Sequence, residues 1–396
     1  MDFVYPPQAD TYRTKVRAFL DANLPKDWKG IGALNHKDAA AWTEDWREKL
    51  AKNDFLATTW PKEYGGAGLT AIESLVIAEE FALSGVPGGG PNDGFGIGML
   101  GNTILAVGTE EQKKHFLPRV LSGEDRWCQG YSEPSAGSDL GNLGCRAVLD
   151  GDEWVINGQK IWTSAGHLAN HIFVLARTSP DDVKHRGITF LLVDMRQKGV
   201  EVRPIKMMSG DSEFNEVFFT DARCPKENVV GEINGGWMVA MTLLGNERGA
   251  GAVVSGISFR GELDKLTRLA TDKGLTKNPH IRQRLAQAHI KVEIMRFLGY
   301  RALPRSLMAI SRDRKRQSAN CGGVNITRKQ QNLLLTFSVL MHWYQLGKHL
   351  TPRSPLTQLV RQTTVLTGLA CSLTHVPEPF TQVPAKYSAA LWANKF

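Results

Sequence analysis

Serine and small residues gather in one short stretch of the chain, QGYSEPSAGSD at residues 129–139. Small residues allow backbone N–H groups to approach a flat or anionic ligand, and hydroxyls can hydrogen-bond the polar edge of a heterocycle. About thirty residues later, QKIWTS at residues 159–164 adds two more hydroxyls and an indole, which suits stacking against a ring system. Either stretch alone would be read as a loop or a core tryptophan. Together they bracket a hairpin and predict a binding site.

A third segment, LGNERGAGA at residues 244–252, carries a carboxylate among unusually small neighbours. Glycine is a poor choice for a surface helix, whereas small side chains on a helix leave room for a ligand. Desolvation beside such space raises the pKa of a carboxylate toward the range of a general base. Glu247 is therefore a candidate base, against the simpler reading of Glu247 and Arg248 as a solvated ion pair.

Two further patterns favour ordinary structural roles. GIGMLG at residues 96–101 matches GxGxxG, but a dinucleotide site needs a preceding strand, and GGGPNDG precedes the match here. His167 and His171 are four residues apart, as two metal ligands on a helix would be, but no HExxH pattern or third ligand accompanies them. We therefore expect a glycine cluster at a helix entry and no bound metal.

The segments that must position these residues change from helical to strand periodicity and back. Helical spacing runs through residues 10–56, and residues 70–85 form an amphipathic helix with Thr70 as its N-cap. Strand periodicity follows, with Asp-Gly at residues 150–151 as a hairpin signal and further strands expected at residues 171–177, 187–193, 200–205 and 216–219. Helical periodicity then returns at residues 237–272 and 280–303.

Composition excludes several classes of protein. With 42% hydrophobic and 22% charged residues among 396, the chain is neither wholly disordered nor fibrous. No apolar run approaches the ~20 residues of a membrane span, and the N-terminus does not read as a signal peptide. The five cysteines are scattered without CxxC spacing, so we expect no disulfide framework, no zinc site and a cytoplasmic location.

The net charge of +8 comes from the end of the chain. Residues 304–396 contain 12 Lys and Arg but only two acids, Asp313 and Glu378, whereas residues 1–303 carry a net charge of −2. Ordinary composition would place about eleven acids in a stretch of that length. The charge-balanced body argues against a nucleic-acid-binding protein, and the last quarter is abnormal in composition.

Six stretches of the chain resemble motifs of the acyl-CoA dehydrogenase family, across essentially all of residues 1–303. They are WPKEYGGAGLT (60–70), GTEEQKKHFLPRVLSGE (108–124), YSEPSAGSD (131–139), NGQKIWTS (157–164), RGITFLLVDM (186–195) and NERGAGA (246–252). The resemblance implies an α+β, acyl-CoA dehydrogenase-like fold. Its parts are an N-terminal helical domain at residues 1–121, a middle β-barrel-like domain at 122–232 and the first part of a C-terminal helical bundle at 233–303.

The resemblance also implies FAD as the cofactor, held between subunits. The positions that match the family's flavin contacts are Gln129, Ser132, Gly137, Ser138, Trp162, Thr163 and Ser164. Ser138 and Arg248 match positions beside the acyl-CoA substrate. Glu247 matches the base of one branch of the family, which includes dehydrogenases of steroid side chains. The Tyr-Glu-Gly stretch that carries the base in another branch does not occur in this sequence.

In this family the base removes the α-proton of an acyl-CoA thioester and flavin N5 accepts the β-hydride, which leaves a trans-2-enoyl-CoA. The resemblance implies an enzyme that passes electrons to an electron-transfer flavoprotein and forms a homo- or hetero-oligomer, without nucleic acid or a membrane span. Two alternatives stay open: a flavin-binding, non-catalytic subunit of a hetero-oligomer, and an acyl-CoA oxidase. Gly245, Gly249 and Gly251 favour a roomy cleft and a bulky acyl group.

The abnormal tail has an explanation in the genetic code. When the third base of each codon is joined to the first two bases of the next, permitted codons for residues 307–327 give NGHQPGPEASIRKLWWSEYH, and those for residues 374–391 give ARAGTIYAGSSQVQRSI. One frame change produces both, and both resemble C-terminal sequences of the family. Against a divergent basic tail, we expect residues 304–396 to be translated out of frame. Such a tail would lack a helical core pattern and leave the chain with weak FAD binding and reduced activity.

Overall fold

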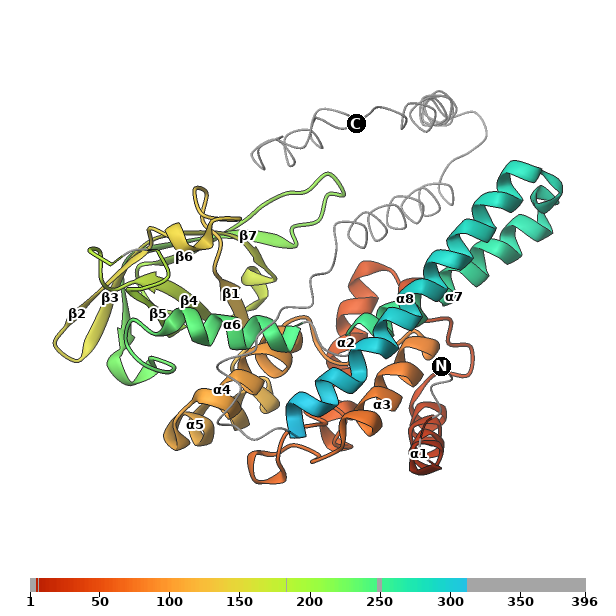
Figure 1. Cartoon of the computed structure of the whole chain (residues 1–396), viewed down its shortest axis with the longest axis horizontal. Helices are drawn as coiled ribbons and strands as arrows, with labels where there is room; N and C mark the ends of the chain where they lie inside the picture. Colours follow the sequence, from red (N-terminus) through yellow and green to blue (C-terminus); the bar gives the residue numbers. More distant parts are fainter. Residues whose placement is uncertain (1–4, 6, 183, 248–250, 312–396) are drawn as a thin grey trace. The chain divides into compact units, whose positions relative to one another are not determined.

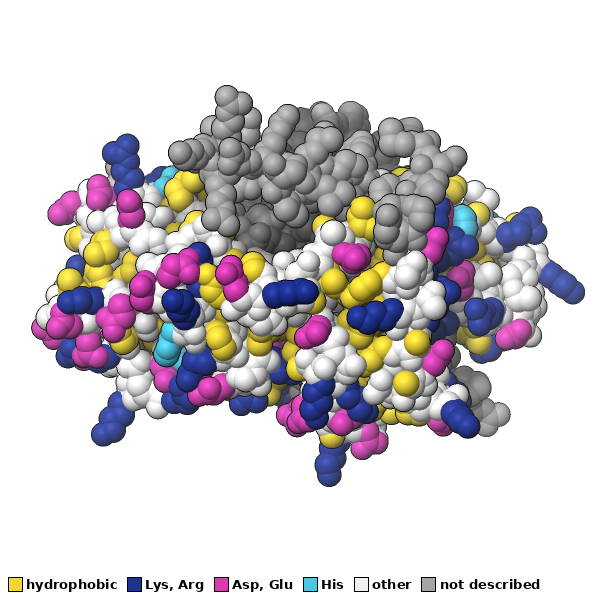
Figure 2. Space-filling view, turned by 90° about the horizontal axis from the view of Figure 1, so that it is seen from below, with side chains coloured by type: hydrophobic (Ala, Val, Ile, Leu, Met, Phe, Trp, Pro, Cys, Tyr) yellow, Lys and Arg dark blue, Asp and Glu magenta, His cyan; other side chains and the backbone are white. Residues whose placement is uncertain are grey.

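The computed structural model describes residues 5, 7–182, 184–247 and 251–311. Along the chain, helices come first, strands follow and helices return (Figure 1). No helix among the described residues is long and apolar enough to cross a membrane. On the face shown in Figure 2, the acidic and basic side chains of the described residues are interspersed rather than gathered into a stripe.

Helices make up the N-terminal part: α1 (Pro7–Asn23), α2 (His36–Lys52), α3 (Ala71–Ser84), α4 (Asn102–Val107) and α5 (Glu110–Ser122). Thr70 before α3 and Thr109 before α5 each form a capping box with the residue three positions on, so the N-cap predicted at Thr70 is confirmed. Aromatic side chains from α1 to α3 and the loop after α2 pack into one buried cluster, with Phe19, Trp46, Phe55 and Phe81 at its centre.

The GxGxxG match lies in a π-helix, Gly94–Gly101, that follows a turn. Packing requires Gly101, because a Cβ there would lie 1.9 Å from Cζ2 of the buried Trp60. The segment therefore lacks the strand that a dinucleotide-binding turn needs, and its glycines serve helix entry and close packing.

Within the described chain, the middle part is one sheet of seven strands. These are β1 (Trp127–Gly130), β2 (Arg146–Asp150), β3 (Glu153–Ser164), β4 (His171–Arg177), β5 (Ile188–Asp194), β6 (Val200–Pro204) and β7 (Phe214–Pro225). The strand order is β1-β4-β2-β3-β7-β6, and β5 pairs with β4. The predicted hairpin turn is confirmed: Gly151, at φ +64°, lies between β2 and β3.

Helix α6 (Gly236–Glu247) begins against strand β5. A Cβ at Gly236 would lie 2.4 Å from the backbone nitrogen of Phe190, so only glycine permits this close approach. Ala240 and Leu243 then pack into the same core as Phe190. These contacts fix the path of α6 toward its last residue, Glu247.

Helices α7 (Gly251–Asp272) and α8 (Pro279–Ser311) complete the described chain. Arg260 on α7 donates a hydrogen bond of 2.8 Å to Glu293 on α8. The helix predicted at residues 237–272 is described as two helices, because residues 248–250 lie outside the described part. The last helix continues eight residues beyond the predicted end at residue 303, so that prediction was too short.

Candidate active site

The structure brings together the two segments that the sequence singled out, residues 129–139 and 159–164. The first contains the end of β1 and the loop after it, and the second forms the end of β3. Between them, the backbone N–H of Ile161 donates to the carbonyl oxygen of Ser132 at 2.9 Å. Residues about thirty positions apart in the sequence therefore lie on neighbouring backbone.

The loop after β1 is closed by its own backbone. Glu133 and Ala136 exchange N–H···O=C hydrogen bonds of 2.9 and 3.1 Å across a two-residue turn. Beyond this turn Gly137 and Ser138 are exposed, and a Cβ at Gly137 would meet nothing within 4 Å. Open space lies beside this backbone, which is what a ligand needs in order to approach it. Gln129 and Ser132 are half-buried at the base of the loop.

Trp162 is held in a strained and exposed conformation. Its φ is +63°, which is rare for a residue other than glycine, and it is 53% exposed. The pairing of β3 with β7 is irregular between Lys160 and Thr163, and Phe214 meets the indole edge-on with ring centroids 5.9 Å apart. Strain of this kind clusters at ligand sites, and an exposed, fixed indole suits contact with a flat ring.

Thr163 carries a buried hydroxyl that has no hydrogen-bond partner among the described residues. The residue is 1% exposed, and its backbone is fixed because Asn215 donates from Nδ2 to its carbonyl oxygen at 2.9 Å. A buried hydroxyl without a partner costs roughly 1–3 kcal/mol. The polar edge of a bound heterocycle would supply the missing partner, so the residues present fit a flavin. Ser164 follows as the half-buried last residue of β3.

The predicted base lies at the edge of what the structure describes. Glu247 is the last residue of α6, one helical turn after the buried Leu243, and its side chain is outside the described part. Arg248 lies outside the described residues altogether. The structure therefore fixes the helix that leads to Glu247 and gives no distance from its carboxylate to residues 129–139 or 159–164.

Sequence reasoning missed the polar residues that tie the site together. Glu133 and Lys160 form a buried ion pair inside the two motifs, and the buried Asn92 donates to the carbonyl oxygens of Trp127 at 3.0 Å and Ala165 at 3.3 Å. One signal was present for the lysine. Trp154, Ile156 and Lys160 are buried on even-numbered positions of β3, so the lysine occupies a place that strand alternation reserves for the core.

The described histidines and cysteines were also considered as metal ligands and nucleophiles. No group of three potential metal ligands occurs among the described residues. His171 lies against Asn170 and Asp125, and burial lowers the pKa of its imidazole, although the Asp125 carboxylate acts in the opposite direction. Burial raises the pKa of Cys145 to about 11 and that of Cys224 to about 12, so these thiols are poor nucleophiles near neutral pH.

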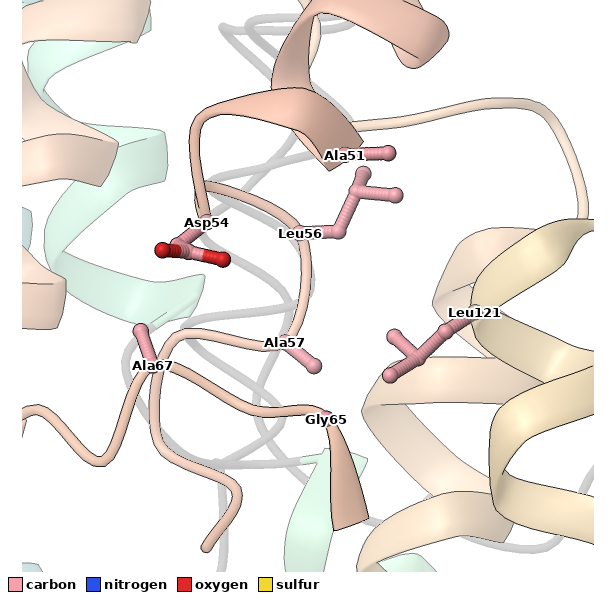
Figure 3. A pocket seen from close by; sticks show the side chains of 7 residues that line it. All are labelled: Ala51, Asp54, Leu56, Ala57, Gly65, Ala67 and Leu121. Carbon is pink, nitrogen blue, oxygen red and sulfur yellow. The ribbon is translucent and has the colours of Figure 1, made fainter. Parts of the chain in front are cut away.

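A cavity of about 50 Å³ lies away from these segments, among the N-terminal helices and their loops (Figure 3). Mostly apolar side chains line it, from Ala51, Asp54, Leu56, Ala57, Gly65, Ala67 and Leu121. A cavity of this size holds a water molecule or two and is far smaller than pockets for cofactors. None of the residues that line it belongs to residues 129–139 or 159–164.

Comparison with known proteins decides the family. Models of the acyl-CoA dehydrogenase N-terminal, middle and C-terminal domains match residues 6–124, 128–222 and 234–319. Acyl-CoA dehydrogenase IpdE1 of Mycobacterium tuberculosis is 42% identical over 291 residues, which are 72% of this chain and 75% of that protein. The chain belongs to the acyl-CoA dehydrogenase family. The resemblance inferred from the motifs is confirmed, and so is the prediction that the chain is an enzyme of the acyl-CoA dehydrogenase type.

Solved structures confirm the α+β fold of this acyl-CoA dehydrogenase. The Tcur3481-Tcur3483 steroid ACAD is 34% identical with a TM-score of 0.66, and the match covers 78% of each chain. The ChsE4-ChsE5 complex from Mycobacterium tuberculosis is 33% identical with a TM-score of 0.64, over 77% of this chain and 78% of that one. In these matches about a quarter of both chains stays unmatched.

Proposed function

We propose that this acyl-CoA dehydrogenase binds FAD through residues 129–139 and 159–164 and converts an acyl-CoA thioester to the trans-2-enoyl-CoA. The observation that carries the proposal is the end of β3, where the unpartnered hydroxyl of Thr163 is buried beside the exposed, strained indole of Trp162. Membership of a family that dehydrogenates acyl-CoA supports the reaction.

The residues of the two segments have distinct roles in this proposal. The loop that carries Gln129, Ser132, Gly137 and Ser138 presents backbone N–H groups and hydroxyls beside open space. Trp162 covers the flavin ring, while Thr163 and Ser164 hydrogen-bond its polar edge. FAD, when bound, supplies the acceptor for the β-hydride.

Glu247 is the proposed base, and its carboxylate accepts the proton that leaves the α-carbon of the acyl group. Arg248 and Ser138 are the proposed contacts of the acyl-CoA. The support for Glu247 is its place at the end of α6, a helix that Gly236 and Leu243 anchor in the core shared with the sheet.

The reaction is tested by mixing the FAD-bound protein anaerobically with linear, branched and steroid-like acyl-CoAs and following loss of the oxidised flavin absorbance. Glu247→Gln should slow flavin reduction by about 10²–10⁴-fold, the usual cost of losing a general base. Glu262→Gln, which alters a glutamate on α7 paired with Lys265, is the matched control and should leave the rate unchanged. Unaltered reduction in Glu247→Gln would remove Glu247 as the base. Peroxide release in air would show that oxygen accepts the electrons, which would make the protein an acyl-CoA oxidase and not a dehydrogenase that reduces an electron-transfer flavoprotein.

We also propose that the chain assembles with another acyl-CoA dehydrogenase chain and acts on a bulky acyl group. Two of the similar structures are named as pairs of chains, and one of these names refers to a steroid substrate class. A purified chain that is colourless alone and gains FAD when mixed with a homologue encoded beside it would support pairing. A chain that binds FAD and turns over alone, with a preference for short linear acyl-CoAs, would contradict both points.

We further propose that the end of the chain is translated out of frame. The matches leave about a quarter of the relatives' length and about a quarter of this chain uncovered. We place the frame change at about residue 304, and the C-terminal family model extends past that point to residue 319. Of the residues expected to lack a helical core pattern, 304–311 continue helix α8, and 312–396 lie outside the described residues. Resequencing codons 300–320 is the test, and a clean reading frame with no family-like sequence in the alternative frame would end the proposal.

A further inference from the structure

A buried ion pair joins the two segments assigned to FAD. Lys160 is 0% exposed, and its Nζ lies 2.7 Å from Oε1 of Glu133, which is 7% exposed. Glu133 follows Ser132 in the loop after β1, and Lys160 precedes Trp162 by two residues in β3. Each charged group is therefore one or two residues from a proposed flavin contact.

The same two side chains hold three pieces of backbone. Lys160 also donates to the carbonyl oxygen of Tyr131 at 3.2 Å. The Glu133 carboxylate also accepts from the backbone N–H of Gly144 at 2.6 Å and of Cys145 at 2.9 Å. The hydrogen bonds connect the loop after β1, the segment before β2 and the end of β3, so one ion pair contacts all three pieces.

Fold stability alone does not explain this pair. The cost of removing two charges from water often equals their attraction, and apolar residues of similar volume are often as stable or more so. What the pair adds is a defined geometry, because a buried lysine requires its one acidic partner in one place. Ile161 follows Lys160 and Ser132 precedes Glu133 in the sequence, so their backbone hydrogen bond joins residues next to the ion pair.

We propose that Lys160 and Glu133 are positioning residues that hold residues 131–133 against residues 160–163 before FAD binds. The inference rests on the proposed FAD site. The Nζ of Lys160 is engaged by the Tyr131 carbonyl oxygen and the Glu133 carboxylate, so it acts through the backbone that carries the Ser132 carbonyl, the Trp162 indole and the Thr163 hydroxyl.

The test uses the full chain with Lys160→Met, Glu133→Gln and Lys160→Arg. Lys226→Met is the control, because it removes an exposed ion pair between the residue after β7 and Asp152 in the β2–β3 turn. Without FAD, amide hydrogen exchange at Ile161, Gly144 and Cys145 should become at least tenfold faster in Lys160→Met and Glu133→Gln. Exchange in the pair β4–β5 should stay as in the unmodified chain. Lys160→Arg keeps the charge and should restore part of the protection.

A second readout is FAD affinity, which should fall about tenfold or more in Lys160→Met and stay unchanged in Lys226→Met. Unchanged exchange at Ile161 would overturn the proposal. So would a uniform rise in exchange across β4–β5 with FAD affinity unaltered, because that pattern belongs to a merely structural pair. The unmodified chain, measured alone and with the homologue encoded beside it, decides the FAD site itself. Failure to bind FAD in both measurements contradicts the proposed function, whereas the exchange data, recorded without FAD, separately decide whether the pair joins the segments.

Discussion

The sheet and the C-terminal helices contribute to the proposed site in different ways. In the sheet, the segments assigned to FAD are held by buried partners: the Lys160–Glu133 pair, Asn92 and Asn215. Among the last helices, the described connection between α7 and α8 includes the half-exposed Arg260–Glu293 pair. On α8, Ile290, Ile294 and Phe297 are exposed at spacings of four and three, which places them on one face of the helix.

The described chain supplies buried partners for the segments of the sheet, whereas it leaves an apolar face of α8 exposed to solvent. The cofactor half of the site is organised by contacts within the sheet and its neighbouring loops. The half that carries the base depends on α6, whose start is fixed by Gly236, and on the helices that follow it. An apolar face on α8 is what a helix shows when further chain is needed to cover it.

The largest expected effect is a difference in the free energy of unfolding. It is seen when one substitution is made both in the chain as written and in a chain whose reading frame is restored after codon 304. Ile294→Glu in the written chain places a charge at an exposed position and should change the free energy of unfolding by less than about 0.5 kcal/mol. In the frame-restored chain the same change should cost about 3–5 kcal/mol, because the face becomes buried and the charge has no partner. Val148→Glu, at an exposed position on β2, is the control. Equal effects of Ile294→Glu in both chains, measured by urea unfolding, would contradict the account.

The next effect tests the sheet half. Thr163→Val removes a buried hydroxyl that has no partner, so the protein without FAD should be as stable as before or slightly more stable. FAD binding should weaken by about 0.5–1.5 kcal/mol, the usual net value of one hydrogen bond. Thermal unfolding measures the first quantity and flavin fluorescence titration the second. A loss of stability without a loss of FAD affinity would show that the hydroxyl serves the fold instead.

The smallest effect concerns pH and His171 at the start of β4, whose ring lies tilted against that of Trp127 with centroids 4.9 Å apart. Burial lowers its pKa below the ordinary 6.5; Asp125 and Asp194 oppose this, and Arg196 and Arg119 reinforce it. The unfolded chain therefore takes up the proton first as pH falls. Stability should be full above pH 6.5 and decline below it, until the lowered pKa of the folded state is passed. Urea unfolding of His171→Gln should show a shallower decline over this window, and parallel curves would contradict the assignment.

Local patterns made much of the fold predictable. The capping residue Thr70, the Asp-Gly turn before β3 and the apolar strand at residues 171–177 each depend on neighbours in the sequence, and the structure has them where they were expected. The site was predicted as residue types in two segments. Their contact through Ile161 and Ser132, and the partnership of Lys160 with Glu133, arise from strand pairing over long sequence separations, which local periodicity does not encode. The positive φ of Trp162 likewise depends on irregular pairing with β7.

The central claim is that residues 129–139 and 159–164 form the FAD site, and a crystal structure of the protein with FAD bound tests it most directly. The account predicts the isoalloxazine ring beside the indole of Trp162, with a polar atom within hydrogen-bond distance of the Thr163 hydroxyl and the loop at Gly137 in contact with the cofactor. A flavin bound elsewhere, or a Thr163 hydroxyl still without a partner in the complex, would contradict it.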